Sequence, residues 1–197
     1  MNLAWLVVVA LFGFLRLVVP VLIVLAPLLA LPTAVLMRLA VAVARDRSPS
    51  WSMAIAELGR LAGRKLLLGT AQLLVLALGV VNVLLAGNIG GILGVISALI
   101  AAYAVIATWM YAVALWPIVC DPDREAPLRE QLRMALTVVI LRPLQIGVLA
   151  LITALAVIIC VQLIAPAVFL PGFVLVVVAG YVVPFVDRLR PVDDQLR

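Results

Sequence analysis

The chain has 197 residues, of which 68% are hydrophobic and only 12% are charged. Soluble domains average about 45–50% apolar and about 25% charged residues, so this composition excludes a water-soluble enzyme, a disordered segment and a nucleic-acid-binding module. It predicts an integral membrane protein whose surroundings are the lipid bilayer. The net charge of +5 is accordingly interpreted as a signal of membrane orientation, and no nucleic-acid partner is expected.

The first apolar segment, residues 3–37, contains one charge and is broken by three prolines, Pro20, Pro27 and Pro32. The preferred interpretation is a long span from Leu3 to Leu25, a turn through the last two prolines, and a short return helix from Thr33 to Ala44. The alternative places residues 1–15 in the membrane interface and uses a single span over 17–37. A removable signal peptide is not expected, because no basic region precedes the apolar run.

Two long charge-free stretches follow. Between Lys65 and Asp121 there are 55 residues without a charge, and between Arg142 and Asp187 there are 44. Since about 20 residues cross the hydrocarbon, each stretch predicts a hairpin of two spans, at 66–86 and 92–116 and at 144–164 and 168–186. Turns are expected at clusters of glycine and proline, namely Ala86–Gly91 in the first hairpin and Ala165–Pro166, followed by Pro171–Gly172, in the second.

The charged residues fall into three groups, which share one face of the membrane because each hairpin returns to its starting side. This face carries 13 of the 14 basic residues, and short loops rich in Lys and Arg stay in the cytoplasm. The loops 38–65 and 121–142 and the C-terminal tail are therefore predicted to be cytoplasmic, in a bacterial plasma membrane. The fold class is an all-α polytopic bundle of about six membrane segments, or five in the alternative, forming a single membrane domain whose parts are 1–45, 46–118 and 119–197.

An amphipathic helix precedes each of the two hairpins. The apolar stripes follow helical spacing: Trp51, Ile55, Leu58 and Ala62 in the first helix, and Leu128, Leu132, Ala135 and Val139 in the second, opposite Arg129, Glu130 and Arg133. We interpret both as cytoplasmic helices on the membrane surface, with the apolar face in the acyl boundary and the basic residues near anionic headgroups. The alternative is a docking surface for a partner protein.

The two hairpin units also match each other at an offset of 78 residues. The matching pairs are Pro49 and Pro127, Arg64 and Arg142, Gly69 and Gly147, and Gly94 and Gly172. Four identities in so biased a composition leave internal duplication and coincidence equally open.

Few polar residues lie in the predicted spans. Arg16 is the only charge among them, and it either contacts an anion or substrate in a cavity or lies at a helix break in the interface. Amides within or at the ends of spans favour hydrogen bonds between helices over ligand binding; the candidates are Gln72, Asn82 and Gln162. The aromatic residues Trp109, Tyr111 and Trp116 are assigned to an interfacial belt without a binding role.

A stripe of small residues at four-residue spacing runs along the span 92–116 and the turn before it: Gly90, Gly94, Ala98 and Ala102. Such a stripe lets another helix approach closely. The expected role is packing within the bundle, and the alternative is contact between copies in a homo-oligomer.

The sequence lacks most of the side chains that catalytic sites use. The chain has no His and only two Cys, Cys120 and Cys160, without the spacing of a metal or redox site. The acidic run Asp121, Asp123 and Glu125 is interpreted as an ordinary turn rather than a cation site. No catalytic, cofactor-binding or metal-binding residue is predicted, so we expect neither an enzyme nor a cofactor.

The order of these segments resembles the YesL-like family of bacterial membrane proteins, whose function is uncharacterised. The similarity lies in the broken first segment ending in Leu31-Pro32-Thr33-Ala34, in the basic stretch from Arg45 to Trp51 that leads into an amphipathic helix, and in Leu141-Arg142-Pro143-Leu144. Asn2 and Trp5 resemble an Asn-x-x-Trp element of the family, although they lie farther from Pro32 than in its members. The resemblance implies a role in carbohydrate uptake, beside a subunit of an ABC-type transporter.

The predicted spans contain no carboxylate, whereas carriers driven by protons or sodium usually hold one within the membrane. Active transport would therefore draw its energy from another chain. The expected function is an accessory or assembly factor for a membrane transporter. The alternative is a small-solute channel or facilitator that acts alone or as an oligomer.

Overall fold

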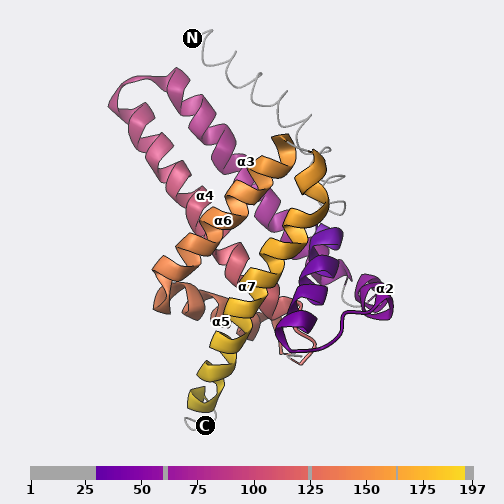
Figure 1. Ribbon diagram of the computed structural model, residues 1–197. Coiled ribbons are helices and arrows are strands. Elements are labelled where there is room, and N and C mark those ends of the chain that lie inside the picture. The colour runs from indigo at the N-terminus through magenta and orange to yellow at the C-terminus, as the bar shows by residue number, and fades with distance from the viewer. Residues whose placement is uncertain (1–29, 60–61, 124–125, 163, 194–197) are drawn as a thin grey trace.

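The computed structural model describes residues 30–59, 62–123, 126–162 and 164–193, and within them every regular element is a helix (Figure 1). This confirms the predicted all-α fold class. The helices are Ala30–Ala44, α2 (Trp51–Gly59), α3 (Ala62–Ile89), α4 (Gly91–Val119), α5 (Leu128–Leu141), α6 (Pro143–Gln162) and α7 (Ile164–Asp193).

Four of these helices are long and apolar enough to cross a membrane: Gly63–Ala86, Gly91–Val119, Pro143–Cys160 and Leu170–Leu189. They coincide with the four spans predicted from the charge-free stretches and are compatible with a multi-pass membrane protein. A helix covers the expected return segment, but the chain is already helical at Ala30. Pro32 therefore lies inside this helix and not in the predicted turn. The predicted first span, Leu3–Leu25, lies outside the described residues.

The turn of the first hairpin is where the glycine cluster predicts it. Gly90 and Gly91 have φ angles of 67° and 63°, a left-handed conformation that glycine adopts without a steric penalty. The second turn is not at the predicted position, because α6 ends at Gln162 and α7 already begins at Ile164. Ala165 and Pro166 belong to the first turn of α7, where proline is tolerated since its missing N–H would have no helical partner. Pro171–Gly172 also lies inside this helix.

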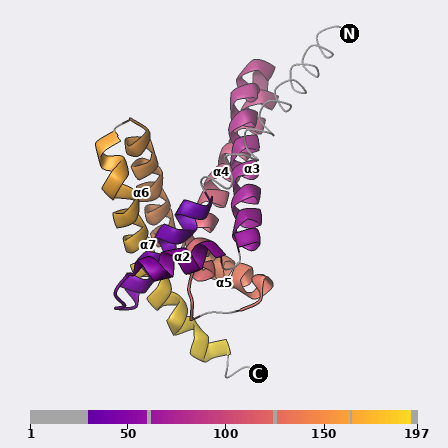
Figure 2. The ribbon, with the colours of Figure 1, turned by 90° about the vertical axis from the view of Figure 1, so that its right-hand side faces the viewer.

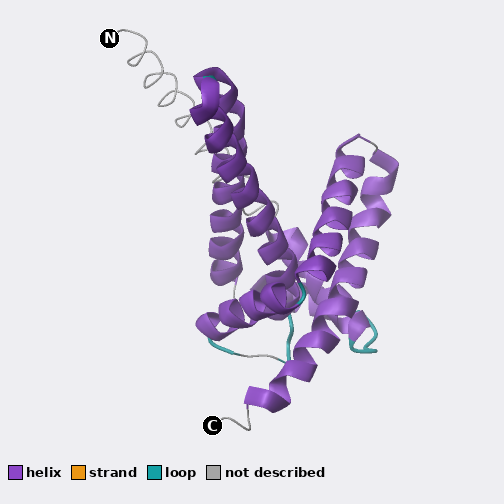
Figure 3. Cartoon of the chain, turned by 90° about the vertical axis from the view of Figure 1, so that its left-hand side faces the viewer, coloured by secondary structure: helices purple, strands orange, loops and turns teal. Residues whose placement is uncertain are grey.

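The two hairpins diverge from a common base (Figures 2 and 3). Among the labelled helices, α3 packs against α4 and α2 only, whereas α4 also contacts α5, α6 and α7. The buried side chains of α4 are concentrated in its last turns, from Val113 to Val119. The C-terminal half of α4 therefore joins the two hairpins, and the base around it contains α2, α5 and the helix Ala30–Ala44.

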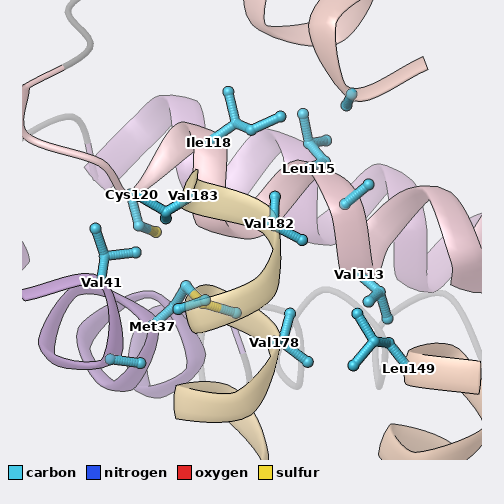
Figure 4. Close-up of a cluster of buried hydrophobic side chains, with 14 of the residues drawn as sticks. Met37, Val41, Val113, Leu115, Ile118, Cys120, Leu149, Val178, Val182 and Val183 are labelled. Atoms are coloured by element: carbon cyan, nitrogen blue, oxygen red, sulfur yellow. The ribbon is translucent and has the colours of Figure 1, made fainter. Parts of the chain in front are cut away.

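A core of mostly small and β-branched side chains fills this base. Figure 4 shows Met37 and Val41 facing Val178 and Val182 of α7, with Leu115 and Ile118 of α4 beside them. Where this core belongs to the candidate spans, the surrounding lipid would be as apolar as the core, so these helices associate through close packing and not through escape from water. Alanine and valine, which dominate the buried residues, suit this close approach.

The amphipathic helix α5 has the predicted position, but its apolar stripe packs against the protein. Ala135 and Val138 are fully buried, and Leu132 and Val139 lie against the core. The expectation that this stripe lies in the acyl boundary is wrong, because α4, α6 and α7 cover it. In α2, by contrast, Ile55 is exposed. Each hairpin thus follows a short helix, α2–α3–α4 and α5–α6–α7, in the order that the repeat hypothesis describes.

Candidate functional site

The most polar part of the described structure is a group of charged residues at the base, here named the ion cluster: Arg38, Arg45, Arg47, Lys65, Asp121, Asp123 and Asp187. Its members come from the end of the helix Ala30–Ala44, the start of α3, the loop after α4 and the last turns of α7. The sequence placed these residues on one face of the membrane without predicting that they meet.

A C-cap at the end of the helix Ala30–Ala44 orients Arg45 and Arg47. The N–H of Arg47 donates to the carbonyl oxygen of Ala42 at 2.9 Å, and that of Asp46 donates to the carbonyl of Val43 at 3.0 Å. With Asp46 at a φ of 54°, this is a Schellman motif, which ends a helix with one left-handed residue. Aspartate adopts that conformation more readily than most residues. The motif turns the chain so that Arg45 and Arg47 both point at the loop after α4.

Two parallel arginine–carboxylate pairs join this turn to that loop. Arg45 donates from Nε to Oδ1 of Asp121 at 3.1 Å and from Nη2 to Oδ2 of the same residue. Arg47 donates from Nη1 and Nη2 to the two oxygens of Asp123, at 3.1 and 2.9 Å. Bidentate pairs of this kind are among the stronger hydrogen bonds in proteins. Asp121 also accepts the backbone N–H of Asp123 at 3.1 Å, which holds the acidic loop in its conformation.

Arg45 is the centre of the cluster. Its Nη2 lies 3.5 Å from Oδ1 of Asp187 on α7, and its Nε lies 3.4 Å from Oδ2 of Asp123. The hydrogen bond to Asp121 raises the pKa of Arg45 above its ordinary value, in spite of partial burial. One guanidinium group therefore ties together three separate segments of the chain.

A second, more basic part of the cluster surrounds the end of α4. Arg38 donates from Nη1 to the carbonyl oxygen of Cys120 at 3.2 Å, a favourable place for a cation because carbonyls at a helix C-terminus carry partial negative charge. Lys65 is buried nearby. Two nitrogens of Arg64, Nε and Nη2, are buried without a hydrogen-bond partner within the described part of the chain. This end of α3 thus concentrates positive charge.

The Cys120 thiol is buried in the same region. Burial raises its pKa from 9.0 to about 12, although Lys65 and Arg38 act in the opposite direction. The thiol is therefore neutral at physiological pH, and the thiolate is the reactive form of cysteine. Within the described residues, no three His, Cys, Asp or Glu side chains are grouped so that they could hold a metal ion. The geometry of the cluster is that of a structural clamp between segments.

The predicted membrane amides occupy three different environments. Asn82 accepts a hydrogen bond from Oγ of Ser97 at 3.1 Å, which links α3 to α4. Gln72 accepts from Nε1 of Trp116 at 2.9 Å, while its Nε2 has no hydrogen-bond partner within the described ranges. Gln162 is exposed at the last position of α6. Arg16 lies outside the described residues. Within the described part of the chain, Gln72, Asn82 and Gln162 do not form one site.

The aromatic side chains of α4 have a role that the sequence did not reveal. Trp109 donates from Nε1 to Oγ1 of Thr153 at 2.9 Å and to the carbonyl oxygen of Ala150 at 3.0 Å. Tyr111 donates from its hydroxyl to the carbonyl oxygen of Leu132 at 3.0 Å. With Trp116 bonded to α3, these aromatic residues connect α4 to α6, α5 and α3 respectively. Their assignment to an interfacial belt alone was incomplete, since a position near a span's end does not show which way a ring points.

The small-residue stripe is divided by the structure. Gly94 is buried, Ala98 and Ala102 are half-buried, and Gly90 is exposed in the turn before α4. The contact line with α3 includes Ser97, Ala101 and Val105, opposite Asn82 and Gly79. At Gly79 the approach is so close that a Cβ atom would clash with Val105.

No protein-family model, no curated protein and no solved structure matches this chain.

Proposed function

We propose that the chain is a multi-pass protein of the bacterial plasma membrane that serves as an accessory or assembly factor for a membrane transporter. The observation that carries this proposal is the divergence of the α3–α4 hairpin from the α6–α7 hairpin (Figure 2). The resemblance to the YesL-like family points to carbohydrate uptake and to a subunit of an ABC-type transporter as the partner.

The α3–α4 hairpin offers a large apolar surface at membrane depth. Among the labelled helices, α3 contacts only α4 and α2, and large side chains such as Leu84, Ile92 and Leu93 are each at least 70% exposed. Helices in a membrane associate through packing of such surfaces and a few interhelical hydrogen bonds. Among the described residues, the outer half of this hairpin packs mainly against itself, so both of its helices can contact the spans of another protein.

The polar groups of the described spans favour this role over a channel. Asn82 bonds to Ser97, Gln72 to Trp116, and Trp109 to Thr153. Each of these pairs joins two helices, so these side chains stabilise the bundle and do not form a continuous polar path. A small-solute channel or facilitator, the alternative predicted from the sequence, therefore has less support.

The ion cluster supports a cytoplasmic location for the base of the molecule. Basic residues in short loops and near the ends of spans mark the cytoplasmic side of membrane proteins. The cluster contains four basic residues, of which Arg45 and Arg47 lie in the loop after the helix Ala30–Ala44. We propose that the loop 120–127 and the end of α7 face the cytoplasm, and that the turn at Gly90 faces the opposite side. Reporter fusions after residue 193 and at Gly90 test this orientation; activity of a periplasmic reporter at the first site would overturn it.

Site-specific photo-crosslinking in native membranes tests the transporter partnership. A photoreactive residue at Leu84 or Leu93 should form crosslinks to a permease subunit, whereas the same residue at Leu151 or Val157, exposed positions of α6, serves as the matched control. Deletion of the gene should also lower the amount of that permease and the rate of sugar uptake. Equal crosslinking from both hairpins, together with unchanged permease and uptake, would overturn the proposal.

A further inference from the structure

The exposed face of α5 carries a regular stripe of basic and apolar side chains. Four exposed residues follow the spacing i, i+4, i+7 and i+11 and therefore form one stripe, here named the outer stripe: Arg129, Arg133, Leu136 and Ile140. It begins with two cations and ends with two large apolar residues. The buried residues Gln131, Ala135 and Val138 lie on the opposite side of the helix.

The apolar end of the outer stripe continues into the surface of a membrane span. α6 begins two residues after α5 ends, and its exposed side chains Leu144, Val148 and Leu151 repeat the same helical spacing. In Figure 1, α5 crosses the base of the bundle and α6 rises from its C-terminal end. Because lipid surrounds the exposed face of α6, the neighbouring Leu136 and Ile140 lie at the edge of the same hydrocarbon layer.

This placement locates Arg129 and Arg133. Arg133 and Arg129 lie on the same stripe, about one turn and two turns closer to the N-terminus of α5 than Leu136. Because α5 crosses the base of the bundle (Figure 1), they lie at the same end of the spans as Leu136 and Ile140. Both are exposed, and neither has a carboxylate partner among the described residues, unlike Arg45 and Arg47 of the ion cluster. Glu130, the acid of α5, lies about 100° around the helix from Arg129 and about 60° from Arg133, to one side of the stripe.

We propose that the outer stripe binds anionic phospholipids, with Arg129 and Arg133 contacting headgroup phosphates and Leu136 and Ile140 contacting acyl chains. Arginine suits this role because its planar donors match phosphate oxygens, and each basic residue near an anionic surface favours binding. The buried apolar stripe fixes α5 to the bundle, so the outer stripe is presented at a fixed depth. This inference does not depend on the transporter partnership.

Lipid binding to the purified full-length chain tests the proposal. Native mass spectrometry with added phosphatidylglycerol or phosphatidylcholine should show a preference for the anionic lipid. The variant Arg129→Gln/Arg133→Gln should reduce that preference by roughly 30-fold, the factor expected for two arginines near an anionic surface, whereas Arg129→Lys/Arg133→Lys should retain most of it. The charge-matched control Arg188→Gln/Arg190→Gln removes two positive charges from the last turns of α7 and leaves both α5 and the ion cluster unaltered.

The control variant shows whether the preference for anionic lipid comes from the outer stripe or from the net positive charge of the protein. If it lowers the preference as much as the α5 variant does, or if the wild-type chain shows no preference, the proposal is overturned. Nitroxide labels in vesicles containing phosphatidylglycerol provide a second readout: those at 136 and 140 should be accessible to oxygen, and one at 129 to a water-soluble nickel complex. Accessibility of all three to the nickel complex, or protection of the stripe by a bound protein, would also overturn it.

Discussion

Arg45 and Asp121 lie 76 positions apart in the sequence and form a two-bonded ion pair at the base of the molecule. The carboxylate side chain is almost fully buried, at 1% exposure, and the guanidinium is 19% exposed. The pair connects the helix Ala30–Ala44 to the loop between α4 and α5, so it fixes the N-terminal part of the described chain against the central helix. A buried carboxylate is stable only while its charged partner is present, which makes this pair a sensitive point of the fold.

Substitution Asp121→Asn should destabilise the folded state by about 2 kcal/mol, the order of magnitude for a partly buried hydrogen bond between charged groups. The amide keeps the shape of the side chain but loses the charge that Arg45 faces. Asp123 and Asp187, which remain near the guanidinium, limit the loss. Unfolding of the purified protein in mixed detergent micelles measures the change in free energy.

The matched control for this substitution is Asp46→Asn. Asp46 is exposed and has a φ of 54°, a conformation that asparagine adopts as readily as aspartate. It removes the same charge from the same end of the molecule and should leave stability within about 0.5 kcal/mol, as surface substitutions usually do. Equal effects of the two substitutions would show that Asp121 acts through net charge alone and not through its pairing with Arg45.

The contact line between α3 and α4 gives a second prediction. A Cβ atom at Gly79 would clash with Val105, a stiff β-branched side chain, whereas one at Gly63 would meet nothing within 4 Å. Gly79→Ala should therefore cost about 1–3 kcal/mol through overpacking, although alanine is the better helix former. Gly63→Ala, in the same helix, should be neutral or stabilising by up to about 1 kcal/mol. Unfolding of both variants by denaturing detergent checks the contrast, and loss of stability in both would refute it.

The residues of this contact line also show what the sequence could and could not predict. The stripe Gly90, Gly94, Ala98 and Ala102 has a constant four-residue spacing, which drifts by about 40° around a helix at each step. The buried Gly94 and the contact-line residues Ser97, Ala101 and Val105 follow steps of three and four and so stay on one face. Spacing by itself predicted that small residues mattered here, but the neighbouring helix selects which of them are buried.

The spans themselves were predictable because a charge-free stretch of known length leaves little choice in a membrane. The sequence could not predict whether lipid or protein covers the apolar face of an amphipathic helix, because lipid and a protein core are both apolar. Small apolar side chains such as Ala135 and Val138 fit either one. The pairing of Arg45 with Asp121 was also hidden, because it depends on how the base of the bundle closes. The sequence did place both residues on the same side of the membrane, which is the condition for their contact.

The hydrogen bond between Asn82 and Ser97 tests the structural role of a predicted membrane amide. A double-mutant cycle of Asn82→Ala and Ser97→Ala should give a coupling energy of about 0.6 kcal/mol, the average for such bonds in a membrane protein. If Asn82 instead contacted a solute, its replacement would change transport while leaving no coupling to Ser97. Unfolding free energies of the two single variants and the double variant, measured in the same detergent, provide the cycle.

Cys120 supplies a prediction about pH. Burial raises the pKa of its thiol from 9.0 to about 12, so at pH 8 the folded state holds roughly 1000-fold less thiolate than an ordinary cysteine. In a Cys160→Ala background, a water-soluble maleimide should label Cys120 at least that much more slowly than in the unfolded chain. Because the pKa is raised in the folded state, the protonated thiol favours folding fully below pH 9, and this contribution is lost as the pH rises from 9 towards 12. Labelling of the folded chain at pH 8 as fast as that of the unfolded chain would show that Cys120 is not enclosed by α4, α7 and the helix Ala30–Ala44.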